Sequence, residues 1–379
     1  MNSADRLQNI QEYYFSKKLR EVRALSAQGK PIINMGIGSP DLLPPQEVIA
    51  AMQQAVLVDG AHKYQSYQGL PAFREAVADF YENNYQVALN PANEILPLMG
   101  SKEGILHISM AFLNKGDQVL IPNPGYPTYT SVTNLLEAIP VFYNLSKENN
   151  WTPDFEQLEQ EDLSNIKLMW VNYPHMPTGA KASVALFEKL IAFGKKHDIL
   201  IINDNPYSFV LNDTPLSILS IAGAKENAIE LNSLSKSFNM AGWRVGMLLG
   251  NKDILEEVLK VKTQMDSGMF YGIQQGAIAA LKVNSDWFQR MNNIYEERRK
   301  LIWKIADLLQ CDYDKNTSGM FVWAKIPPGK TAESIVDDLL YNKDIFIAPG
   351  TIFGSSGEGY IRFSLCVPEE KIKEALDRL

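Results

Sequence analysis

Apolar residues near the start of the chain recur at approximately helical spacing. They are Leu7, Ile10, Tyr14, Leu19, Val22 and Leu25, and the run ends near Gln28-Gly29. Residues three and four apart share one face of a helix, so the pattern predicts an amphipathic helix. We expect this N-terminal segment to pack as an arm against another part of the molecule.

Between Met99 and Gly250, short apolar runs alternate with helical patterns. The runs include 118–121, 168–171, 200–202 and 245–249, and the helical patterns include 102–113 and 184–196. The alternation predicts an α/β fold in which helices cover both faces of a mostly parallel sheet. Ligands of such sheets bind at the carboxyl ends of the strands, so functional side chains are expected directly after the apolar runs.

The C-terminal part of the chain has a different order of elements. A helical stretch over 286–309 precedes two strand-like segments, 320–325 and 360–365, which flank a helical segment at 331–340. This order predicts a smaller α+β domain.

The chain has 379 residues, enough for two domains of ordinary size. We expect residues 1–45 to form the arm and part of the small domain, residues 46–285 the large domain, and residues 286–379 the small C-terminal domain. The content of 46% hydrophobic and 21% charged residues is typical of a soluble globular protein.

The charge balance and the cysteines indicate which partners and which cellular compartment to expect. A formal charge of -8, from 36 basic and 44 acidic residues, argues against nucleic acid or an anionic membrane as a partner. No apolar stretch approaches the roughly 18 residues of a spanning helix. Cys311 and Cys366 are too few for a disulfide framework and lack metal-ligand spacing. We therefore expect a cytoplasmic protein with two inert thiols and no metal site.

One lysine, Lys236, stands between two groups that can bind a phosphate. Ser233 precedes it by three residues, and Arg244 follows it by eight. A primary amine can condense with an aldehyde to form a Schiff base, while an arginine can hold a phosphate through two hydrogen bonds. The arginine charge also disfavours a protonated lysine nearby. The segment therefore predicts a site for a phosphorylated aldehyde.

The pattern S-x-x-K, with a later arginine inside G-W-R-x-G, resembles the lysine signature of the fold type I aminotransferases that depend on pyridoxal 5'-phosphate (PLP). The resemblance covers essentially the whole chain and implies an α/β PLP-transferase fold with an internal aldimine on Lys236. Segments 100–104 and 266–270 are most similar to the branch that contains LL-diaminopimelate, alanine and methionine-type aminotransferases.

The D-x-x-Y segment after the apolar run at 200–202 fits the cofactor ring. A carboxylate at Asp204 would keep the pyridine nitrogen protonated, which sustains the ring as an electron sink. Tyr207 can donate to the phenolate oxygen and tune the Schiff base. The segment resembles the family's ring-binding motif, so we predict Asp204 and Tyr207 as catalytic residues beside Lys236.

The glycine turn at 100–104 lies between a predicted strand and a predicted helix, where backbone amides can bind a phosphate. The resemblance assigns this role to the amides of Ser101 and Lys102. It also implies that the ring of Tyr126 stacks on the cofactor. Tyr64 would reach across a dimer interface to the other subunit's phosphate, which implies a homodimer with two shared sites.

The substrate carboxylate needs a fixed fork of donors, and Arg362 resembles the C-terminal family arginine in that role. The upstream segment 349–354 also matches the family. Ile37 and Gly38 lie in a segment similar to the one that closes over the substrate, where Gly38 lets the backbone approach closely. No second arginine is clearly positioned for a side-chain carboxylate, so a dicarboxylic specificity is not supported.

One position departs from the family pattern. The usual N-P-T-G motif begins here with Met176, which cannot donate a conventional hydrogen bond to the cofactor or the substrate. Either Tyr207 and Arg362 act with less help, or a neighbour such as His175 or Asn172 substitutes. Asn172 is counted among the predicted cofactor-binding residues, and Met176 among those that bind substrate. We expect a raised Schiff-base pKa, looser carboxylate binding or a bulkier apolar substrate.

Together these features predict a homodimeric PLP-dependent aminotransferase that moves an amino group from an L-amino acid to a 2-oxo acid. Lys236 would take the Cα proton and return it to the cofactor's C4' carbon. Two alternatives stay open. One is a PLP-dependent C-S lyase acting at the β or γ carbon, because the same fold and lysine serve both reactions. The other is a PLP-binding regulatory module without turnover.

Overall fold

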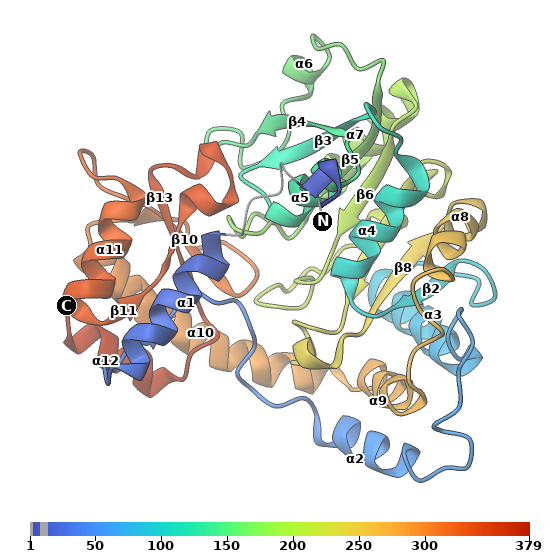
Figure 1. Ribbon diagram of the computed structural model, residues 1–379, viewed down its shortest axis with the longest axis horizontal. Coiled ribbons are helices and arrows are strands. Elements are labelled where there is room, and N and C mark those ends of the chain that lie inside the picture. The colour runs from blue at the N-terminus through green and yellow to red at the C-terminus, as the bar shows by residue number, and fades with distance from the viewer. Residues whose placement is uncertain (1–2, 8–13) are drawn as a thin grey trace.

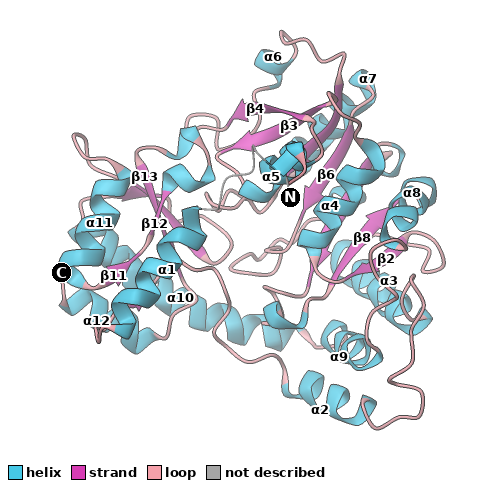
Figure 2. Cartoon of the chain, in the orientation of Figure 1, coloured by secondary structure: helices cyan, strands magenta, loops and turns pink. Residues whose placement is uncertain are grey.

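The computed structural model describes residues 3–7 and 14–379. Two parts lie side by side: a large sheet between helices, and a smaller sheet with its own helices (Figure 1). Helices flank both sheets, as the colouring by secondary structure shows (Figure 2). Within the described ranges, no helix is long and apolar enough to cross a membrane.

The large sheet has seven strands in the order β2-β8-β7-β6-β5-β3-β4. The strands are β2 (Ile95–Leu98), β3 (Gln118–Asn123), β4 (Ile139–Asn144), β5 (Ile166–Val171), β6 (Leu200–Asp204), β7 (Ala228–Ser233) and β8 (Gly246–Gly250). Strand β8 pairs antiparallel with β2 and β7, and the other pairs are parallel. The predicted α/β class with a mostly parallel sheet is confirmed.

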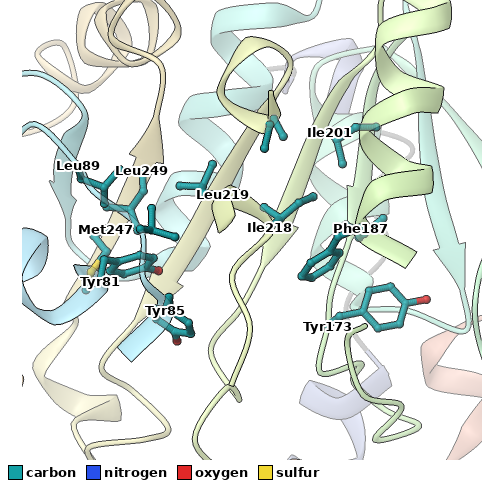
Figure 3. Packing of buried hydrophobic residues seen from close by; sticks show 14 of the residues in the cluster. Tyr81, Tyr85, Leu89, Tyr173, Phe187, Ile201, Ile218, Leu219, Met247 and Leu249 are labelled. Carbon is teal, nitrogen blue, oxygen red and sulfur yellow. The ribbon is translucent and has the colours of Figure 1, made fainter. Parts of the chain in front are cut away.

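Eight α-helices belong to this part: α2 (Gln46–Ala55), α3 (Pro71–Tyr85), α4 (Ser101–Phe112), α5 (Pro127–Leu135), α6 (Phe155–Leu158), α7 (Val184–His197), α8 (Lys252–Lys262) and α9 (Tyr271–Leu281). Successive residues of a strand point to opposite faces, so the sheet has two cores. Ile201 packs with α3, α7 and α9 in one core (Figure 3). The next residue, Ile202, packs with α4, α5 and α8 in the other.

The smaller part contains a four-stranded sheet in the order β12-β13-β10-β9, together with the two-stranded pair β1-β11. Its strands are β1 (Ile33–Asn34), β9 (Asp312–Tyr313), β10 (Phe321–Lys325), β11 (Ile345–Phe346), β12 (Ala348–Pro349) and β13 (Tyr360–Ser364). Its helices are α1 (Tyr14–Ala27), α10 (Ser285–Leu308), α11 (Ala332–Lys343) and α12 (Glu369–Asp377). Short 3-10 helices lie at Asp5–Leu7, Ile218–Ser220, Ala224–Glu226, Ala241–Trp243, Gly350–Phe353 and Ser355–Gly357.

The N-terminal segment completes this smaller part, as α1 lies against the C-terminal elements (Figure 1). Lys18 pairs with Asp337 on α11 at 2.9 Å, and β1 runs parallel to β11. The described part of this helix, Tyr14–Ala27, contains the expected apolar residues Tyr14, Leu19, Val22 and Leu25. Leu7 ends a 3-10 helix, and Ile10 lies outside the described residues. The domain boundaries near residues 45 and 285 remain a prediction.

The segment after β1 is also tied to the smaller part. The amide of Met35 donates to the Phe346 carbonyl at 2.7 Å, and the Ser364 amide donates to the Met35 carbonyl at 2.8 Å. Farther along, both carboxylate oxygens of Asp41 accept from Arg298 of α10, at 2.7 and 2.9 Å. These bonds hold residues 35–41 against the smaller part, next to the carboxyl ends of the large sheet.

Candidate active site

A cavity of about 290 Å³ lies at the carboxyl ends of the large sheet. Its lining residues are Ser101, Lys102, Tyr126, Tyr129, Asn172, Met176, Asp204, Pro206, Tyr207, Ser233, Ser235, Lys236, Ala241 and Arg244. Most of the residues predicted from the sequence are among them. A larger cavity of about 450 Å³, lined in part by Trp151 and Asp312, contains none of the predicted residues.

Lys236 is half-buried and lines this cavity, shortly after β7 ends. Its Nζ donates to the carbonyl of Gly38, which places the predicted substrate-closing segment directly against the lysine. Burial lowers the pKa of Lys236, and the charges of Arg362 and Arg244 act in the same direction. A lowered pKa favours the neutral amine, which is the nucleophilic and proton-accepting form.

Asp204 is the last residue of β6, and its carboxylate is buried at the cavity wall. Burial raises its pKa to about 7, against the opposing effect of the Tyr129 hydroxyl, which donates to Oδ2 at 2.9 Å. The other oxygen, Oδ1, is buried and has no hydrogen-bond partner within the described structure. Tyr207 lies three residues after Asp204 and packs edge-on against Phe321, with ring centroids 5.8 Å apart.

Donor groups gather at the start of α4. The helix follows Gly100, whose φ is 92° and which has no side chain to cap the first amides. A Cβ at position 100 would lie 2.3 Å from Nη2 of Arg244, so only glycine lets the guanidinium lie against the helix start. Ser233, at the end of β7, also lines the cavity. Helix amides, a cation and a hydroxyl in one place favour an anionic group.

The loop that departs from the family motif is held from within. The Asn172 amide donates to the backbone carbonyl of Asp204, and its Oδ1 accepts from the Met176 amide at 2.7 Å. His175 is buried with Nδ1 2.8 Å from the Thr178 hydroxyl, and burial lowers its pKa to about 3. His175 does not line the cavity, so of the two suggested substitutes only Asn172 does.

Arg362 lies on β13 behind the cavity, in an unusually apolar setting. Its guanidinium stands 3.9 Å from the ring centre of Phe321 and 4.6 Å from that of Phe353. Nη2 donates to the Gly36 carbonyl at 2.7 Å, and Nη1 lies 3.4 Å from the Met176 sulfur, a weak acceptor. Burial lowers the pKa of Arg362 to about 10, which leaves it cationic at neutral pH.

Two predicted residues lie apart from these groups. The Tyr64 side chain is 90% exposed and does not line the cavity of its own chain. Ile37 is partly exposed beside Gly38. A role for Tyr64 in a partner subunit therefore remains a prediction.

The sequence reasoning missed Tyr129, which lies at the cavity wall and contacts Asp204. Its spacing was a usable signal, because residues three apart on a helix share a face and Tyr126 was already a candidate. It also missed the two rings around Arg362. Phe353 lies in the segment 349–354, which matched the family, whereas nothing in the sequence set Phe321 apart from core residues.

Known proteins similar to this chain agree on one family. The model of the family described as aminotransferase class I and II matches residues 30–379. LL-diaminopimelate aminotransferases from Dehalococcoides mccartyi and Halothermothrix orenii are each 40% identical to the chain, over 100% of its length and 98% of theirs.

Solved structures share the same architecture. Substrate-bound BacF from Bacillus subtilis has a TM-score of 0.96 at 34% identity, covering 100% of this chain and 97% of that one. A mutant aspartate aminotransferase from Thermus thermophilus has a TM-score of 0.92 at 23% identity, covering 100% and 98%, which shows the shared fold.

Proposed function

The chain belongs to the class I and II aminotransferases, and from this premise we propose which of its residues act and on which substrates. The predicted family, the fold type I architecture and the aminotransferase activity are confirmed by the family match and by relatives that cover the whole chain. The roles of single residues, the dimer and the substrates are our proposal.

PLP is the cofactor that the family implies, and the cavity residues fit it. The start of α4, Arg244 and Ser233 would hold the phosphate. The open oxygen of Asp204 would accept from the pyridine nitrogen, because a buried carboxylate oxygen without a partner calls for a donor. Lys236 would hold the aldehyde carbon. When bound, PLP supplies an aldehyde that condenses with amines and a ring that withdraws electrons from the substrate Cα.

Lys236, Tyr207 and Tyr126 have different roles in the proposed reaction. Its neutral Nζ takes the proton from the substrate Cα, since burial lowers its pKa. Tyr207 is kept protonated, because burial raises its pKa, so its hydroxyl can donate to the cofactor's phenolate oxygen. The Tyr126 ring would cover one face of the cofactor. The single observation that carries this proposal is that Lys236, Asp204 and Arg244 meet in one cavity.

Arg362 holds the substrate's α-carboxylate in this proposal. Among the described residues, only one strong acceptor, the Gly36 carbonyl, contacts its guanidinium, so other N–H groups such as Nε are left for a ligand. Phe321 and Phe353 exclude water from the cation, which strengthens its attraction for a carboxylate. Met176 adds a sulfur where the family has an amide, so we propose that Arg362 binds the carboxylate with less help. The names of the relatives make LL-diaminopimelate the first donor to test, and because this donor has a second carboxylate, groups other than a second arginine would have to bind it.

We also propose a homodimer located in the cytoplasm. Tyr64 is exposed, as a residue that reaches a partner's phosphate would be, and Leu57 and Val58, a few positions earlier in the chain, are exposed apolar residues. Cys311 and Cys366 are free and buried, and burial raises the pKa of both thiols, in keeping with inert groups in a reducing compartment.

The test is the absorbance spectrum of the purified protein while single amino acids are added without any 2-oxo acid. Conversion of bound cofactor to its amine form would support amino transfer and rank the donors, with LL-diaminopimelate tested among them. Lys236→Ala serves as the control that should not respond. Release of ammonia without the amine form would favour the C-S lyase, and absence of bound cofactor would contradict the role of Lys236.

A further inference from the structure

The two oxygens of the Asp204 carboxylate have different surroundings. Oδ2 accepts from the Tyr129 hydroxyl at 2.9 Å, whereas Oδ1 has no partner among the described residues. Both side chains are buried, and both line the cavity. One oxygen is therefore occupied by the protein, and the other is left as the open acceptor.

The hydroxyl of Tyr129 is held in place by its ring and backbone. The ring stacks on Trp170 with centroids 4.8 Å apart and planes 8° apart, and it meets Tyr126 edge-on at 5.6 Å. The Thr133 hydroxyl donates to the Tyr129 carbonyl at 2.8 Å within α5. Two packed faces leave the phenol little freedom, so its O–H has a fixed direction.

The chemistry of the pair fixes which group donates. An ionised carboxylate only accepts hydrogen bonds, so the phenol is the donor. Burial and the nearby Asp204 charge raise the pKa of Tyr129, which keeps the phenol protonated. A buried carboxylate without a donor would take up a proton, and a protonated Asp204 could no longer attract a cationic ring nitrogen.

We infer that Tyr129 is a positioning residue, which turns Oδ1 of Asp204 toward the pyridine nitrogen of PLP and keeps the carboxylate ionised for it. This inference rests on the proposed function of the cavity. Tyr126 and Tyr129 then serve the same ligand from the first turn of α5, one through its ring face and the other through Asp204.

The test variant is Tyr129→Phe, which keeps the ring that stacks on Trp170 and removes only the hydroxyl. The matched control is Tyr143→Phe. Tyr143 is also buried, and its hydroxyl donates to the Trp170 carbonyl at 2.6 Å, with no contact to Asp204. Each variant therefore removes one hydroxyl oxygen from a buried tyrosine that contacts Trp170.

Wild-type and variant enzymes are loaded either with PLP or with an analogue in which carbon replaces the ring nitrogen, and cofactor loss during dialysis is measured. For Tyr129→Phe we expect PLP affinity to fall about tenfold or more, as for a lost charge-assisted hydrogen bond, with little change for the analogue. Tyr143→Phe should treat both ligands as the wild type does.

The ratio of the two affinities is internal to each variant, so partial unfolding cannot imitate the expected result. A purely structural role for Tyr129 predicts equal losses for PLP and the analogue, and this outcome would overturn the inference. Unchanged PLP affinity in Tyr129→Phe would overturn it as well. If wild-type protein fails to hold PLP, the proposed function fails instead, which separates the two conclusions.

Discussion

Asp204 and Arg362 are buried charges of opposite sign, which we propose bind the cofactor and the substrate, and their surroundings stabilise them in different ways. Asp204 is 5% exposed, with a hydroxyl donor on one oxygen and an amide on its backbone carbonyl. Arg362 is 4% exposed and lies mainly between aromatic rings. Asp204 is therefore stabilised by polar partners, whereas Arg362 is contacted mainly by ring faces and by one carbonyl.

The difference determines how each group responds to an empty site. Burial brings the pKa of Asp204 to about 7, so its charge near neutral pH depends on its partners. The pKa of Arg362 falls only to about 10, so its charge does not depend on a ligand. The cofactor end is therefore completed by what binds there, whereas the substrate end is charged in advance.

Replacing Asp204 should have the largest effect on activity. Asp204→Asn keeps the shape of the side chain and removes the charge that we propose for the ring nitrogen. We expect kcat to fall roughly 10²–10³-fold, the range for loss of one preorganised electrostatic partner. Steady-state kinetics of the saturated enzyme measure this, with the exposed Asp213→Asn as the control. A loss as small as that of Asp213→Asn would contradict the role of Asp204.

The pH dependence of the free energy of unfolding tests the raised pKa of Asp204 in the cofactor-free protein. Because the pKa of Asp204 is raised from 3.8 to about 7, the folded state holds its proton longer than the unfolded state does. Stability contributed by Asp204 should therefore be present at low pH and decline between about pH 4 and pH 7, by up to about 1.4 kcal/mol per unit. Urea unfolding of wild type and Asp204→Asn measures it, and parallel curves would refute it.

Replacing Arg362 should weaken substrate binding and leave cofactor binding unchanged. Arg362→Lys keeps the charge and loses the planar fork that can hold a carboxylate through two bonds. We expect kcat/KM for the amino donor to fall about 10–100-fold, with PLP affinity unchanged. The exposed Arg290→Lys is the matched control. Loss of PLP binding in Arg362→Lys would mean that the two ends of the site are not independent.

Restoring the family amide should give the smallest effect. Met176→Asn adds a donor beside Arg362, so we expect the KM of the amino donor to fall about three- to tenfold, the size of one hydrogen bond. The exposed Met265→Asn controls for surface polarity. If both KM and the pH titration of the cofactor absorbance stay unchanged, Met176 does not set carboxylate binding.

The large sheet, and the gathering of the proposed cofactor residues at its edge, could be predicted because they follow local patterns. Buried parallel strands are continuous apolar runs, and Asp204, Ser233 and Asn172 lie at or directly after their carboxyl ends. The packing of the Phe321 and Phe353 rings around Arg362 could not be predicted in this way. Phe321 and Arg362 lie on paired strands whose register is a tertiary property, and Phe321 reads as an ordinary core residue.

Tyr129 illustrates the same limit at closer range. Its distance from Tyr126 was visible in the sequence, but its contact with Asp204 depends on how α5 rests on the sheet. The N-terminal helix shows the reverse case, since the apolar spacing of its own residues was enough to indicate the helix over Tyr14–Ala27.

The pairing of the arm with the C-terminal elements has a consequence for synthesis on the ribosome. Lys18 and Met35 emerge early, whereas their partners Asp337 and Phe346 emerge more than three hundred residues later. The central sheet, complete once Gly250 is translated, can form while the arm has nothing to dock on. The segments that contain Phe346 and Ser364 then hold residues 35–41 beside Lys236, so the nascent chain assembles the proposed reactive centre only after both segments have left the ribosome.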